Sequence, residues 1–493
     1  MSAAIAQSSF PAGPARIASS LPLCVDLDGC LTSTDTFAES LSIAFKIAPL
    51  RTLLCLLRLF FSSRAVVKHE ISRIARPDAA LLPYHKDFLL YLRGEAEKGR
   101  ELYLVTGAHE SIAQDVVTEL GFFSGYISTH GKINLTGKTK ARILVERFGL
   151  RGFVYAGNSR ADLPVWRSAA EAIAVNCGRP VRRGLVRMDN VTKVFPSPTS
   201  TWRALWQALR PYQWAKNVLV LLPLVTSHRL FEWSLVWKTG LAFAAFCLCA
   251  SGGYLFNDLA DIESDRRNPA KRMRPLASGR LSPGTAAVAG VVCLAASLSI
   301  GAFLSFPFTL VLVTYIALTA VYCWYFRAKM LVDVISLTLL YSLRLLGGHI
   351  ICGVEASNWL IATSLFLFLG LALLKRYTEI RFLIEESSSP PMGRAYMPSD
   401  LPILQTLGVV SSFAAVLVLA LYIDSTAVLH YRSPQFLWAW CLLLLYYMSR
   451  VWMIANRKRM AVDPVQFAIR DRVAYLTVAA GLFVYALASY VTI

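Results

Sequence analysis

The sequence lacks the cysteine patterns of a secreted or zinc-binding protein. Its ten cysteines are scattered, without a CxxC pair or a Cys/His spacing typical of a metal site. This pattern predicts no disulfide framework and fits a reducing cytosol together with a lipid bilayer. The first twenty residues also lack the apolar segment of a signal peptide, so we expect the N-terminal domain to stay in the cytoplasm.

Acidic residues are few compared with basic ones. The chain has 31 Asp and Glu against 50 Lys and Arg, a formal net charge of +19. Such a balance can indicate a nucleic-acid-binding protein, but no such module appears, and the cations do not form a soluble basic face. Many of them lie between apolar segments, where anionic lipid, phosphate ligands and membrane topology explain them better. We therefore expect membrane lipids and phosphorylated substrates as partners, and no nucleic acid.

The composition changes along the chain. Of the 493 residues 55% are hydrophobic, but residues up to about Ser200 read as a mixed soluble domain, and the remainder is mostly apolar. The Pro/Ser-rich stretch Val194–Ser200 marks the boundary. We predict four parts: a tail at 1–20, a soluble domain at 21–195, a linker at 196–203 and a membrane domain at 204–493.

Hydropathy predicts an all-α membrane domain with about nine spans. They lie roughly at 205–227, 233–256, 284–304, 307–326, 330–352, 357–376, 403–423, 435–455 and 471–492. Basic residues concentrate in alternate loops, which by the positive-inside rule face the cytoplasm. This predicts an integral protein of the inner (cytoplasmic) membrane, with its soluble domain on the cytoplasmic side. A homo-oligomer formed through the spans is compatible with this arrangement.

Three acidic residues follow the apolar run Thr239–Phe256. Asp258, Asp261 and Asp265 have i, i+3, i+7 spacing, which on a helix places them within about 60° of one another. Their carboxylates repel unless divalent cations lie between them. Hard oxygen ligands of this kind suit Mg²⁺, which usually completes its shell with substrate phosphates. Charge at the end of a span is usually functional, whereas a solvated polar loop would not require three acids in register.

The basic residues that come next can bind further phosphate oxygens; they are Arg266, Arg267, Lys271, Arg272 and Arg274. The whole stretch Asn257–Gly279 reads NDLADIESDRRNPAKRMRPLASG. It resembles the NDxxDxxxD signature of the UbiA superfamily of intramembrane prenyltransferases, including the trailing KxxRPLASG. The resemblance covers roughly the last three fifths of the chain. It implies a donor diphosphate bound through Mg²⁺ on the three catalytic aspartates, with Asn257 orienting them.

Three further elements resemble one branch of this superfamily, the decaprenyl-phosphate phosphoribosyltransferases. They are LRPYQWAKN at Leu209–Asn217, the YxxxK element at Tyr325–Lys329 and LLKRYTE at Leu373–Glu379. The resemblance implies phosphoribosyl pyrophosphate as the donor and a polyprenyl phosphate as the acceptor. Two phosphorylated substrates need many cations, which this sequence supplies. The residues implied in substrate binding are Arg210, Lys216, Asn217, Asn257, Lys271, Arg274, Tyr325, Lys329, Arg344, Lys375 and Arg376.

Each of these cations has a simpler explanation when it is taken singly, as an interfacial anchor of a span. Arg344 is harder to explain in this way because it lies inside its span. Asp333 is expected either to coordinate metal or to neutralise a nearby cation.

Three short apolar runs in the first part of the chain each end in a polar cluster. The runs are Leu21–Val25, Leu102–Val105 and Phe153–Ala156. Helix-like stretches lie between them, and this alternation predicts a parallel α/β sheet. Sites on such sheets lie at the carboxyl ends of the strands, which is where all three polar clusters occur.

The first cluster, DLDGCLTSTDT from Asp26, resembles the DxDGxLT motif of the haloacid dehalogenase superfamily, whose members are mainly phosphatases. The resemblance implies a Rossmann-like fold with a helical cap. It implies Asp26 as the nucleophile that forms an aspartyl-phosphate and Asp28 as the general acid/base. Thr106 would bind the phosphoryl group. Lys140 would neutralise its charge, with Lys138 as a substitute.

This second resemblance covers roughly residues 20–195 and implies Mg²⁺ bound by Asp26, Asp28, Asn158 and Asp162. The fourth motif usually reads GDxxxD, but here Asn158 replaces the first acid. An amide oxygen can ligate Mg²⁺ but brings no charge, so metal affinity and rate are expected to fall. A degenerate, purely structural domain is the alternative.

Between the first two of these motifs, Leu50–Ser63 (LRTLLCLLRLFFSS) has a narrow polar stripe on an otherwise apolar helix. This segment is expected either to lie on the membrane or to pack, as part of the cap, against the core.

Together these patterns favour an enzyme with two activities: an Mg²⁺-dependent phosphoribosyltransferase, and a phosphatase that removes the 5-phosphate of its lipid product. The main alternative is an aromatic prenyltransferase that uses a polyprenyl diphosphate, with a separate phosphatase or regulatory N-terminal domain. A transporter that binds cations through its acids is disfavoured, because the sequence lacks an obvious pair of repeated, Gly/Pro-broken spans.

Overall fold

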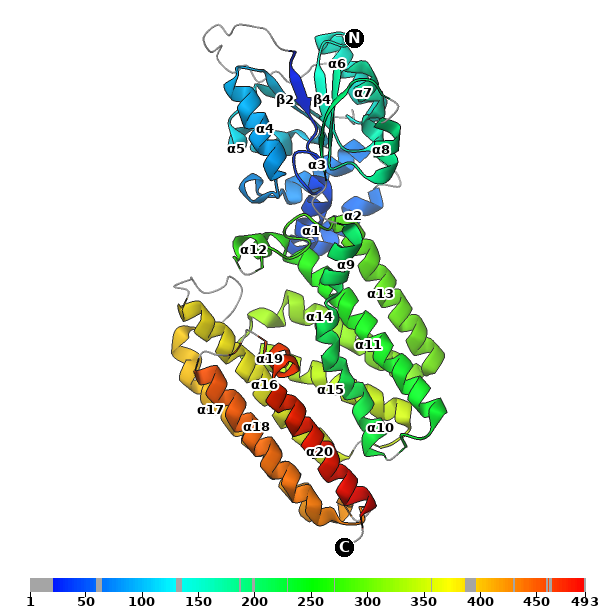
Figure 1. Ribbon diagram of the computed structural model, residues 1–493, viewed down its shortest axis with the longest axis vertical. Helices are drawn as coiled ribbons and strands as arrows, with labels where there is room; N and C mark the ends of the chain where they lie inside the picture. The colour runs from blue at the N-terminus through cyan, green and yellow to red at the C-terminus, as the bar shows by residue number, and fades with distance from the viewer. Residues whose placement is uncertain are drawn as a thin grey trace. The chain divides into compact units, whose positions relative to one another are not determined.

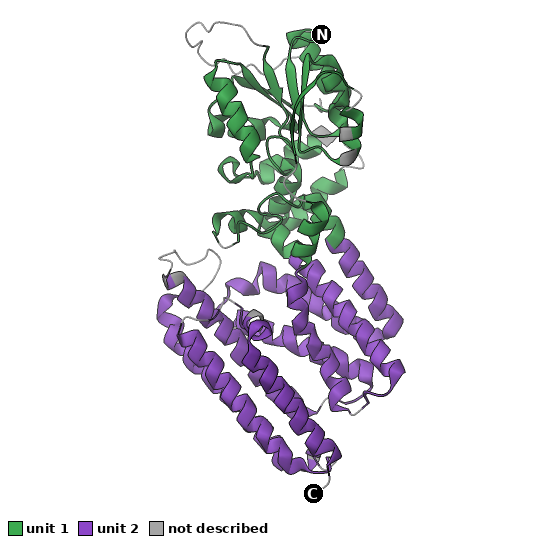
Figure 2. Ribbon diagram, viewed as in Figure 1, with its two compact units in different colours: residues 1–209, 255–289 green, residues 210–254, 290–493 purple. Residues whose placement is uncertain are grey.

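The computed structural model divides the chain into two compact units (Figure 2). Unit 1 is Met1–Leu209 with Leu255–Ala289, and unit 2 is Arg210–Tyr254 with Gly290–Ile493. The acidic motif therefore belongs to the same unit as the N-terminal domain. The structure describes residues 21–58, 64–129, 135–185, 188–196, 200–227, 229–269, 271–355, 357–385, 396–428, 431–457, 460 and 463–491.

Unit 1 contains a six-stranded sheet with the strand order β3-β2-β1-β4-β5-β6. Two of its strands, β2 and β4, are labelled in Figure 1. The strands are β1 (Leu23–Val25), β2 (Leu102–His109), β3 (Gly125–Thr129), β4 (Val154–Gly157), β5 (Glu171–Val175) and β6 (Val191–Phe195). Every neighbouring pair is parallel, so the predicted parallel α/β sheet is confirmed. The three predicted strands are β1, β2 and β4, and β2 continues beyond its predicted end at Val105.

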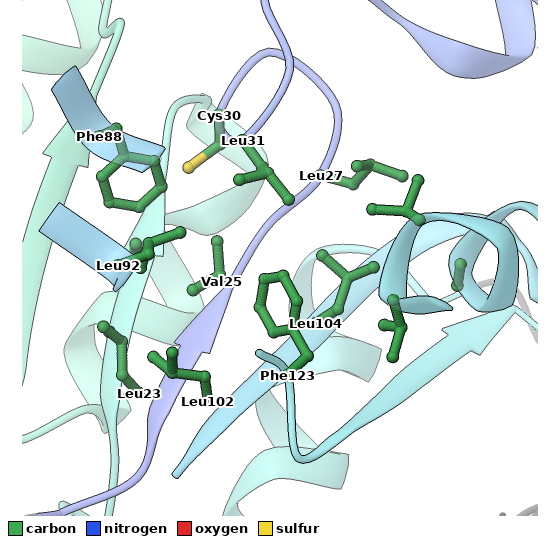
Figure 3. Close-up of a cluster of buried hydrophobic side chains, with 14 of the residues drawn as sticks. Leu23, Val25, Leu27, Cys30, Leu31, Phe88, Leu92, Leu102, Leu104 and Phe123 are labelled. Atoms are coloured by element: carbon green, nitrogen blue, oxygen red, sulfur yellow. The ribbon is translucent and has the colours of Figure 1, made fainter. Parts of the chain in front are cut away.

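The alternation of side chains along the strands builds a separate core on each face of the sheet. Leu23 and Val25 of β1 belong to one core, with Phe88 and Leu92 (Figure 3). Cys24, between them, belongs to the other. The helices around the sheet are α4 (Lys86–Glu97), α5 (Glu110–Leu120), α6 (Gly137–Phe148), α7 (Leu163–Ser168) and α8 (Arg179–Leu185), with the short η2 (Ala79–Leu81) and η3 (Arg160–Asp162). The strand ends that carry the polar clusters are therefore supported on both faces.

Between β1 and β2 three helices precede η2 and α4: α1 (Thr36–Ile47), α2 (Pro49–Leu57) and α3 (Arg64–Ile74). The side chain of Asp35 caps α1, because it accepts a hydrogen bond from the backbone N–H of Ala38 at 2.9 Å. On α2 the four leucines of the apolar face at positions 50, 53, 54 and 57 are exposed by 76%, 49%, 62% and 49%. Packing of this face against the core, one of the two expectations for this segment, is therefore wrong for α2, and residues 59–63 lie outside the described part of the chain.

The acidic motif lies between two long helices, α11 (Trp233–Ala260) and α13 (Pro283–Leu304), with the short α12 (Ile262–Arg267) between them. Apolar side chains around the motif pack with α9 (Thr201–Leu209) in a core of their own. Its members include Ala204, Ala208, Leu255, Leu259, Ile262, Leu276 and Leu281. This packing fixes the turn in which the basic residues lie.

Eight helices among the described residues are long and apolar enough to cross a membrane. They are α11, α13, α14 (Phe306–Trp324), α15 (Val332–Cys352), α16 (Asn358–Glu385), α17 (Leu401–Asp424), α18 (Trp438–Asn456) and α20 (Arg472–Tyr490), and the short α19 (Pro464–Arg470) precedes the last. The predicted count of nine is not confirmed.

The difference lies in the first predicted span, 205–227. In its place the chain forms α9, the 3-10 helix η4 (Pro211–Leu221) and the short α10 (Leu222–Thr226). Arg210 has a left-handed backbone with φ of 54°, and prolines begin or interrupt the segments after it. Because proline removes a backbone donor and clashes with the preceding turn, an apolar stretch of this composition does not form one long helix.

Candidate active sites

The first candidate site lies at the carboxyl ends of three neighbouring strands. Asp26 directly follows β1, and Thr106 lies in β2, where its Oγ1 accepts a hydrogen bond from the backbone N–H of Ala108 at 3.0 Å. Asn158 and Asp162 follow β4. Because β2, β1 and β4 are adjacent and parallel, these residues come to the same edge of the sheet.

A buried lysine joins the residues at this edge. Lys140 Nζ donates to Asp26 Oδ1 at 2.8 Å and lies 3.8 Å from Asp162 Oδ1. It also donates to the hydroxyl oxygen of Tyr155 at 3.0 Å, and that hydroxyl donates to Asp162 Oδ1 at 2.8 Å. The structure thus brings Asp26, Lys140 and Asp162 together, whereas Lys138, the alternative phosphate-binding lysine, is exposed.

Tyr155 is a residue that the motifs did not indicate. It lies inside β4, where the side chains alternate between the two faces of the sheet. Ala156 belongs to one core and Tyr155 to the other, so its ring is buried while its hydroxyl reaches the site. A tyrosine in a strand just before a polar loop is the signal that could have found it, because a buried tyrosine hydroxyl usually has a partner.

The carboxylate of Asp162 organises the loop after β4. Its Oδ2 accepts hydrogen bonds from the backbone N–H groups of Asn158 at 3.1 Å and Ser159 at 2.9 Å, and from Ser159 Oγ at 2.9 Å. The side chain of Asn158 lies against Gly29, since a Cβ on that glycine would come 2.1 Å from Asn158 Nδ2. Asn158, which stands where the resemblance expects an acid, is therefore held beside the loop that follows Asp28.

The surroundings of Asp26 and Asp28 raise the pKa of both carboxyl groups. Burial raises the pKa of Asp26 to about 7, and the ion pair with Lys140 limits the rise. Burial also raises the pKa of Asp28 to about 6; the charge of Asp35 adds to this rise. The backbone N–H of Thr36, which donates to Asp28 Oδ1 at 2.8 Å, opposes it. A carboxyl group that titrates near neutral pH suits a general acid/base.

The second candidate site is the acidic motif. Asp258 is on α11 and Asp265 is on α12, and both are buried. Arg274 Nη1 lies 3.2 Å from Asp258 Oδ1 and 2.7 Å from Asp265 Oδ2. Lys271 Nζ lies 3.9 Å from Asp265 Oδ1. Two carboxylates of the motif therefore converge on one cationic group.

The spacing of the acids predicted one continuous helix, but the motif is divided between two. α11 ends at Ala260. The backbone N–H of the next residue, Asp261, donates to the carbonyl oxygen of the half-buried Asn257 at 3.0 Å. Asp261 precedes the first turn of α12, a position that aspartate favours over a helix interior. Its Oδ1 accepts a hydrogen bond from Lys46 Nζ of α1 at 3.0 Å. The structure thus directs this third acid to a lysine of the N-terminal domain.

The basic residues after the acids have different partners. Arg266 donates to both carboxylate oxygens of Glu39, at 2.9 and 2.5 Å. Arg267 donates to Asp78 Oδ2 at 3.2 Å. These two arginines, expected to bind phosphate, are instead engaged with carboxylates of the N-terminal domain, whereas Arg274 faces the acidic motif.

Two of the three acids of the motif suit a magnesium ion. The carboxylates of Asp258 and Asp265 both face Arg274 Nη1. Mg²⁺ prefers carboxylate oxygens of this kind, and it is a cation like the group that they face. Burial raises the pKa of Asp265, an effect that the charge of Arg274 opposes and that of Asp258 reinforces. In the described part of the chain, no group of three or more His, Cys, Asp or Glu side chains is arranged to hold a metal ion. In the structure the lysines and arginines named above neutralise these acids.

A model of the UbiA prenyltransferase family matches residues 218–470, which is slightly more than half of the chain. The chain belongs to the UbiA prenyltransferase family. Uncharacterized protein y4nM of Sinorhizobium fredii is 34% identical over 461 residues, 92% of this chain and 88% of that protein. Decaprenyl-phosphate phosphoribosyltransferase of Corynebacterium glutamicum is 35% identical over 218 residues, 42% of this chain and 65% of that protein. A solved UbiA homolog from Archaeoglobus fulgidus, bound to GPP and Mg²⁺, has a TM-score of 0.44 and 17% identity, over 57% of this chain and 99% of that chain.

Membership of the UbiA family agrees with the eight apolar helices, and the protein is a transferase and an integral membrane protein. Relatives named decaprenyl-phosphate phosphoribosyltransferase match about two fifths of the chain, so the homology to that branch is shown for part of the chain. The relative in S. fredii matches nearly the whole chain and therefore extends into the N-terminal domain.

Arg344 of this UbiA-family protein is held in a buried network of unit 2. Its Nε donates to Asn217 Oδ1 at 2.7 Å and its Nη2 donates to the hydroxyl of Tyr315 at 2.7 Å. The structure thus brings together two of the predicted substrate-binding residues. Lys216 donates instead to Asp463 Oδ2 at 3.1 Å, a partner that the sequence did not indicate because it lies 247 residues away.

A second buried network of unit 2 surrounds Arg376. This side chain forms an ion pair with Asp333 and donates to Glu379 Oε2 at 2.5 Å and to the hydroxyl of Tyr322 at 2.8 Å. Asp333 Oδ1 also accepts from the hydroxyl of Tyr396 at 2.5 Å. Of the two expectations for Asp333, neutralisation of a nearby cation is the one that the structure matches.

Two other predicted cations of unit 2 lie beside aromatic rings. Lys329 Nζ is 5.2 Å from the centre of the ring of Tyr325, and the guanidinium of Arg210 is 5.0 Å from that of Tyr254. Lys375 is half-buried on α16. Tyr325 and Lys329 are exposed, so in this unit they present a cation and a ring that a ligand can reach.

Proposed function

We propose that the protein transfers a 5-phosphoribosyl group from phosphoribosyl pyrophosphate to a polyprenyl phosphate. The observation that carries the proposal is the convergence of Asp258 and Asp265 on Arg274 at the end of an apolar helix. Buried carboxylates beside cations suit a complex of a diphosphate with Mg²⁺. The relatives named decaprenyl-phosphate phosphoribosyltransferase favour a ribosyl donor over a prenyl donor.

The proposed transfer needs no protein base. An oxygen of the acceptor phosphate, already an anion, attacks the anomeric carbon. The bond from that carbon to the diphosphate breaks, and the diphosphate leaves with the bonding electrons. Asp258, Asp261 and Asp265 would hold Mg²⁺, which would supply positive charge at the leaving group. Lys271 and Arg274 bind diphosphate oxygens, so the chain contributes positioning and electrostatic stabilisation.

For the N-terminal domain we propose a phosphatase of the haloacid dehalogenase type that removes the 5-phosphate of the lipid product. Asp26 attacks phosphorus, the bond from phosphorus to the ribose oxygen breaks, and Asp28 gives a proton to that oxygen. Water then attacks the phosphorus of the aspartyl-phosphate while Asp28 accepts a proton from it. The bond from phosphorus to the Asp26 oxygen breaks, which releases inorganic phosphate and restores the carboxylate. Lys140, in contact with Asp26, offsets the phosphoryl charge. Asp26, Asp28, Asn158 and Asp162 would hold Mg²⁺.

We propose that both sites lie on the cytoplasmic side of the inner membrane. The support is the distribution of basic residues, which concentrate in the loops on the side of the acidic motif. The two sites would then lie on the same side of the membrane, so that the lipid product of the transferase can reach the phosphatase.

The test is an assay of purified full-length protein in detergent with Mg²⁺, polyprenyl phosphate and labelled phosphoribosyl pyrophosphate, followed by mass spectrometry of the lipid phase. We expect a lipid-linked phosphoribose and then a species lighter by one phosphate. Asp26→Asn should stop the sequence at the first product, and Lys138→Ala, at an exposed site, should give both. Consumption of a polyprenyl diphosphate with an aromatic acceptor, without label in the lipid, would replace this proposal by an aromatic prenyltransferase.

A further inference from the structure

Helix α1, labelled in Figure 1, contacts both candidate sites of unit 1. At its N-terminus the backbone N–H of Thr36 donates to Asp28 Oδ1 at 2.8 Å. In its last turn Lys46 Nζ donates to Asp261 Oδ1 at 3.0 Å. The helix has 12 residues, and at about 1.5 Å per residue it is roughly 18 Å long. One helix thus contacts Asp28 of the proposed phosphatase site at its start and Asp261 of the acidic motif at its end.

A buried ion pair fixes this helix on the motif. The side chains of Glu39 and Arg266 are 0% and 5% exposed, and two hydrogen bonds join them. Arg266 Nε also donates to the carbonyl oxygen of Ala277 at 2.9 Å. A buried charge that loses its partner is strongly destabilising, so this pair permits little sliding of one segment on the other.

The turn after the basic residues makes a second close contact with the N-terminal domain. Gly279 has φ of +72°, and a Cβ there would lie 2.8 Å from Ser33 Cβ and 2.9 Å from Pro83 Cγ. A residue without a side chain is therefore required both by the backbone and by the approach of the two segments. The register that puts Lys46 beside Asp261 is fixed at several points.

We propose that Lys46 is a diphosphate ligand of the transferase, so that the soluble domain completes the transferase site. The proposal deepens the proposed function and rests on it for the identity of the donor. The side chain of Lys46 is 45% exposed and that of Asp261 10% exposed. An ammonium group has three donors, and the hydrogen bond to Asp261 uses one. Arg266, by contrast, is buried and committed to Glu39, and it anchors the helix.

The test measures binding of inorganic pyrophosphate with Mg²⁺ to the full-length protein by calorimetry, in parallel with the KM for the diphosphate donor. Binding that Asp258→Ala removes is assigned to the transferase site. We expect Lys46→Ala to weaken that binding and to raise the KM by about tenfold, since a charge-assisted hydrogen bond contributes about 1.5 kcal/mol or more. Lys46→Arg should restore most of the affinity, and Lys86→Ala, at an exposed lysine of α4, should change neither value.

The outcomes separate the two proposals. Hydrolysis of a soluble phosphate ester by the N-terminal domain should stay at the wild-type rate in Lys46→Ala, which excludes a general loss of folding. If the Lys46→Ala variant binds pyrophosphate as tightly as the Lys86→Ala variant, Lys46 is not a diphosphate ligand. If pyrophosphate binding depends on Lys46 but the protein transfers no phosphoribose, Lys46 remains a diphosphate ligand and phosphoribosyl pyrophosphate is rejected as the donor.

A different observation supports a second inference, about α2. Leu50, Leu53, Leu54 and Leu57 have the i, i+3, i+4, i+7 spacing of one helix face, and all four are exposed. Ile47, just before the helix, is 65% exposed. Apolar side chains gathered in this way mark a contact surface, since their burial stabilises by about 25 cal/mol per Å² of apolar area.

We infer that this face of α2 lies in the lipid interface. α2 starts three residues after Lys46, and the partner of Lys46 is Asp261, the residue that follows the end of the apolar helix α11. The exposed Arg51 adds positive charge, which favours anionic headgroups, whereas Arg58 forms an ion pair with Glu70. The occupant is therefore lipid that surrounds the spans of the same molecule.

Lipid contact can be measured in nanodiscs that contain anionic lipid. An environment-sensitive fluorophore is attached at Leu54→Cys or at Leu90→Cys, an exposed leucine of α4, and labelling of the native cysteines is subtracted with the wild-type protein. We expect spin-labelled lipid to quench the probe at position 54 strongly and the probe at position 90 weakly. Equal weak quenching at both positions would overturn the inference.

Discussion

The two carboxylate clusters of unit 1 are assembled in different ways. In the first, Lys140 is 114 residues from Asp26, and parallel strands bring the participating segments to one edge of the sheet. In the second, Asp258 and Asp265 come from one short stretch that crosses the break between α11 and α12. The first cluster therefore depends on the topology of a whole domain, whereas the second depends on where one helix ends.

The cations of the two clusters differ in the same sense. Lys140 is buried and serves the carboxylates of its own domain. The acidic motif takes Arg274 from its own turn but Lys46 from 215 residues away. The first cluster is therefore self-contained, whereas the second depends on contact with another part of unit 1.

The largest effect is expected when the local cluster loses an acid. Asp258→Ala removes one of the two carboxylates that converge on Arg274. Transfer of phosphoribose to lipid should fall by more than about a hundredfold, because loss of one electrostatic contact in a catalytic site has effects of that order. The readout is label in the lipid phase, with the phosphatase activity measured in the same preparation.

A matched control sharpens that result. Asp424→Ala changes an exposed aspartate at the end of α17, another apolar helix, and should leave transfer near the wild-type rate. Transfer that survives in Asp258→Ala, or that is lost equally in both variants, would contradict the assignment of the motif.

The sheet-borne cluster can be broken by a single lysine. Lys140→Met removes the cation that touches Asp26, and hydrolysis of a soluble phosphate ester should fall by about a hundredfold, since the phosphoryl charge is then unbalanced. Lys138→Met changes an exposed lysine on the same helix and should alter the rate by less than about twofold. Steady-state kinetics of both variants decide the assignment, and equal losses would be evidence against it.

The sequence predicted best what depends on neighbours along the chain. Three apolar runs identified β1, β2 and β4, and the motifs placed Asp26 and Asp162 at strand ends. The period of the acids was interpreted as one helix, but Asp261 lies where α11 stops, and helix ends depend on packing and capping more than on period. The same limit explains the first predicted span, where prolines break an apolar stretch.

Contacts between distant segments could not be predicted from the sequence. Glu39 reads as an ordinary helix residue, and Lys46 as a basic residue at a helix end; neither has a spacing that points to Arg266 or Asp261. Tyr155 was missed for a similar reason, because a tyrosine in a strand looks like a core residue until Lys140 of α6 is known to lie beside its hydroxyl. Partners of this kind are set by the fold.

A smaller effect, on stability, should separate buried from exposed ion pairs. Glu39→Ala leaves Arg266 buried without its carboxylate, and the expected loss is about 3 kcal/mol. Asp115→Ala breaks an ion pair with Arg76 in which both side chains are about half exposed, and should lose less than about 1 kcal/mol. Thermal unfolding of both variants in the same detergent gives the comparison, and similar midpoints would contradict a special role for the Glu39 pair.

The smallest expected effect concerns Asn158, the position at which the first cluster lacks an acid. Its backbone N–H donates to Asp162 and its side chain is packed against Gly29, so an aspartate of nearly the same shape fits without repacking. Asn158→Asp adds a negative charge beside Asp26 and Asp162. We expect the Mg²⁺ concentration for half-maximal phosphatase activity to fall by about threefold to tenfold, because charge on the ligands strengthens binding of a hard cation. Without Mg²⁺ the added repulsion should lower the unfolding midpoint. An unchanged Mg²⁺ requirement would mean that this position does not contact the metal, and that the asparagine serves the packing of the loop.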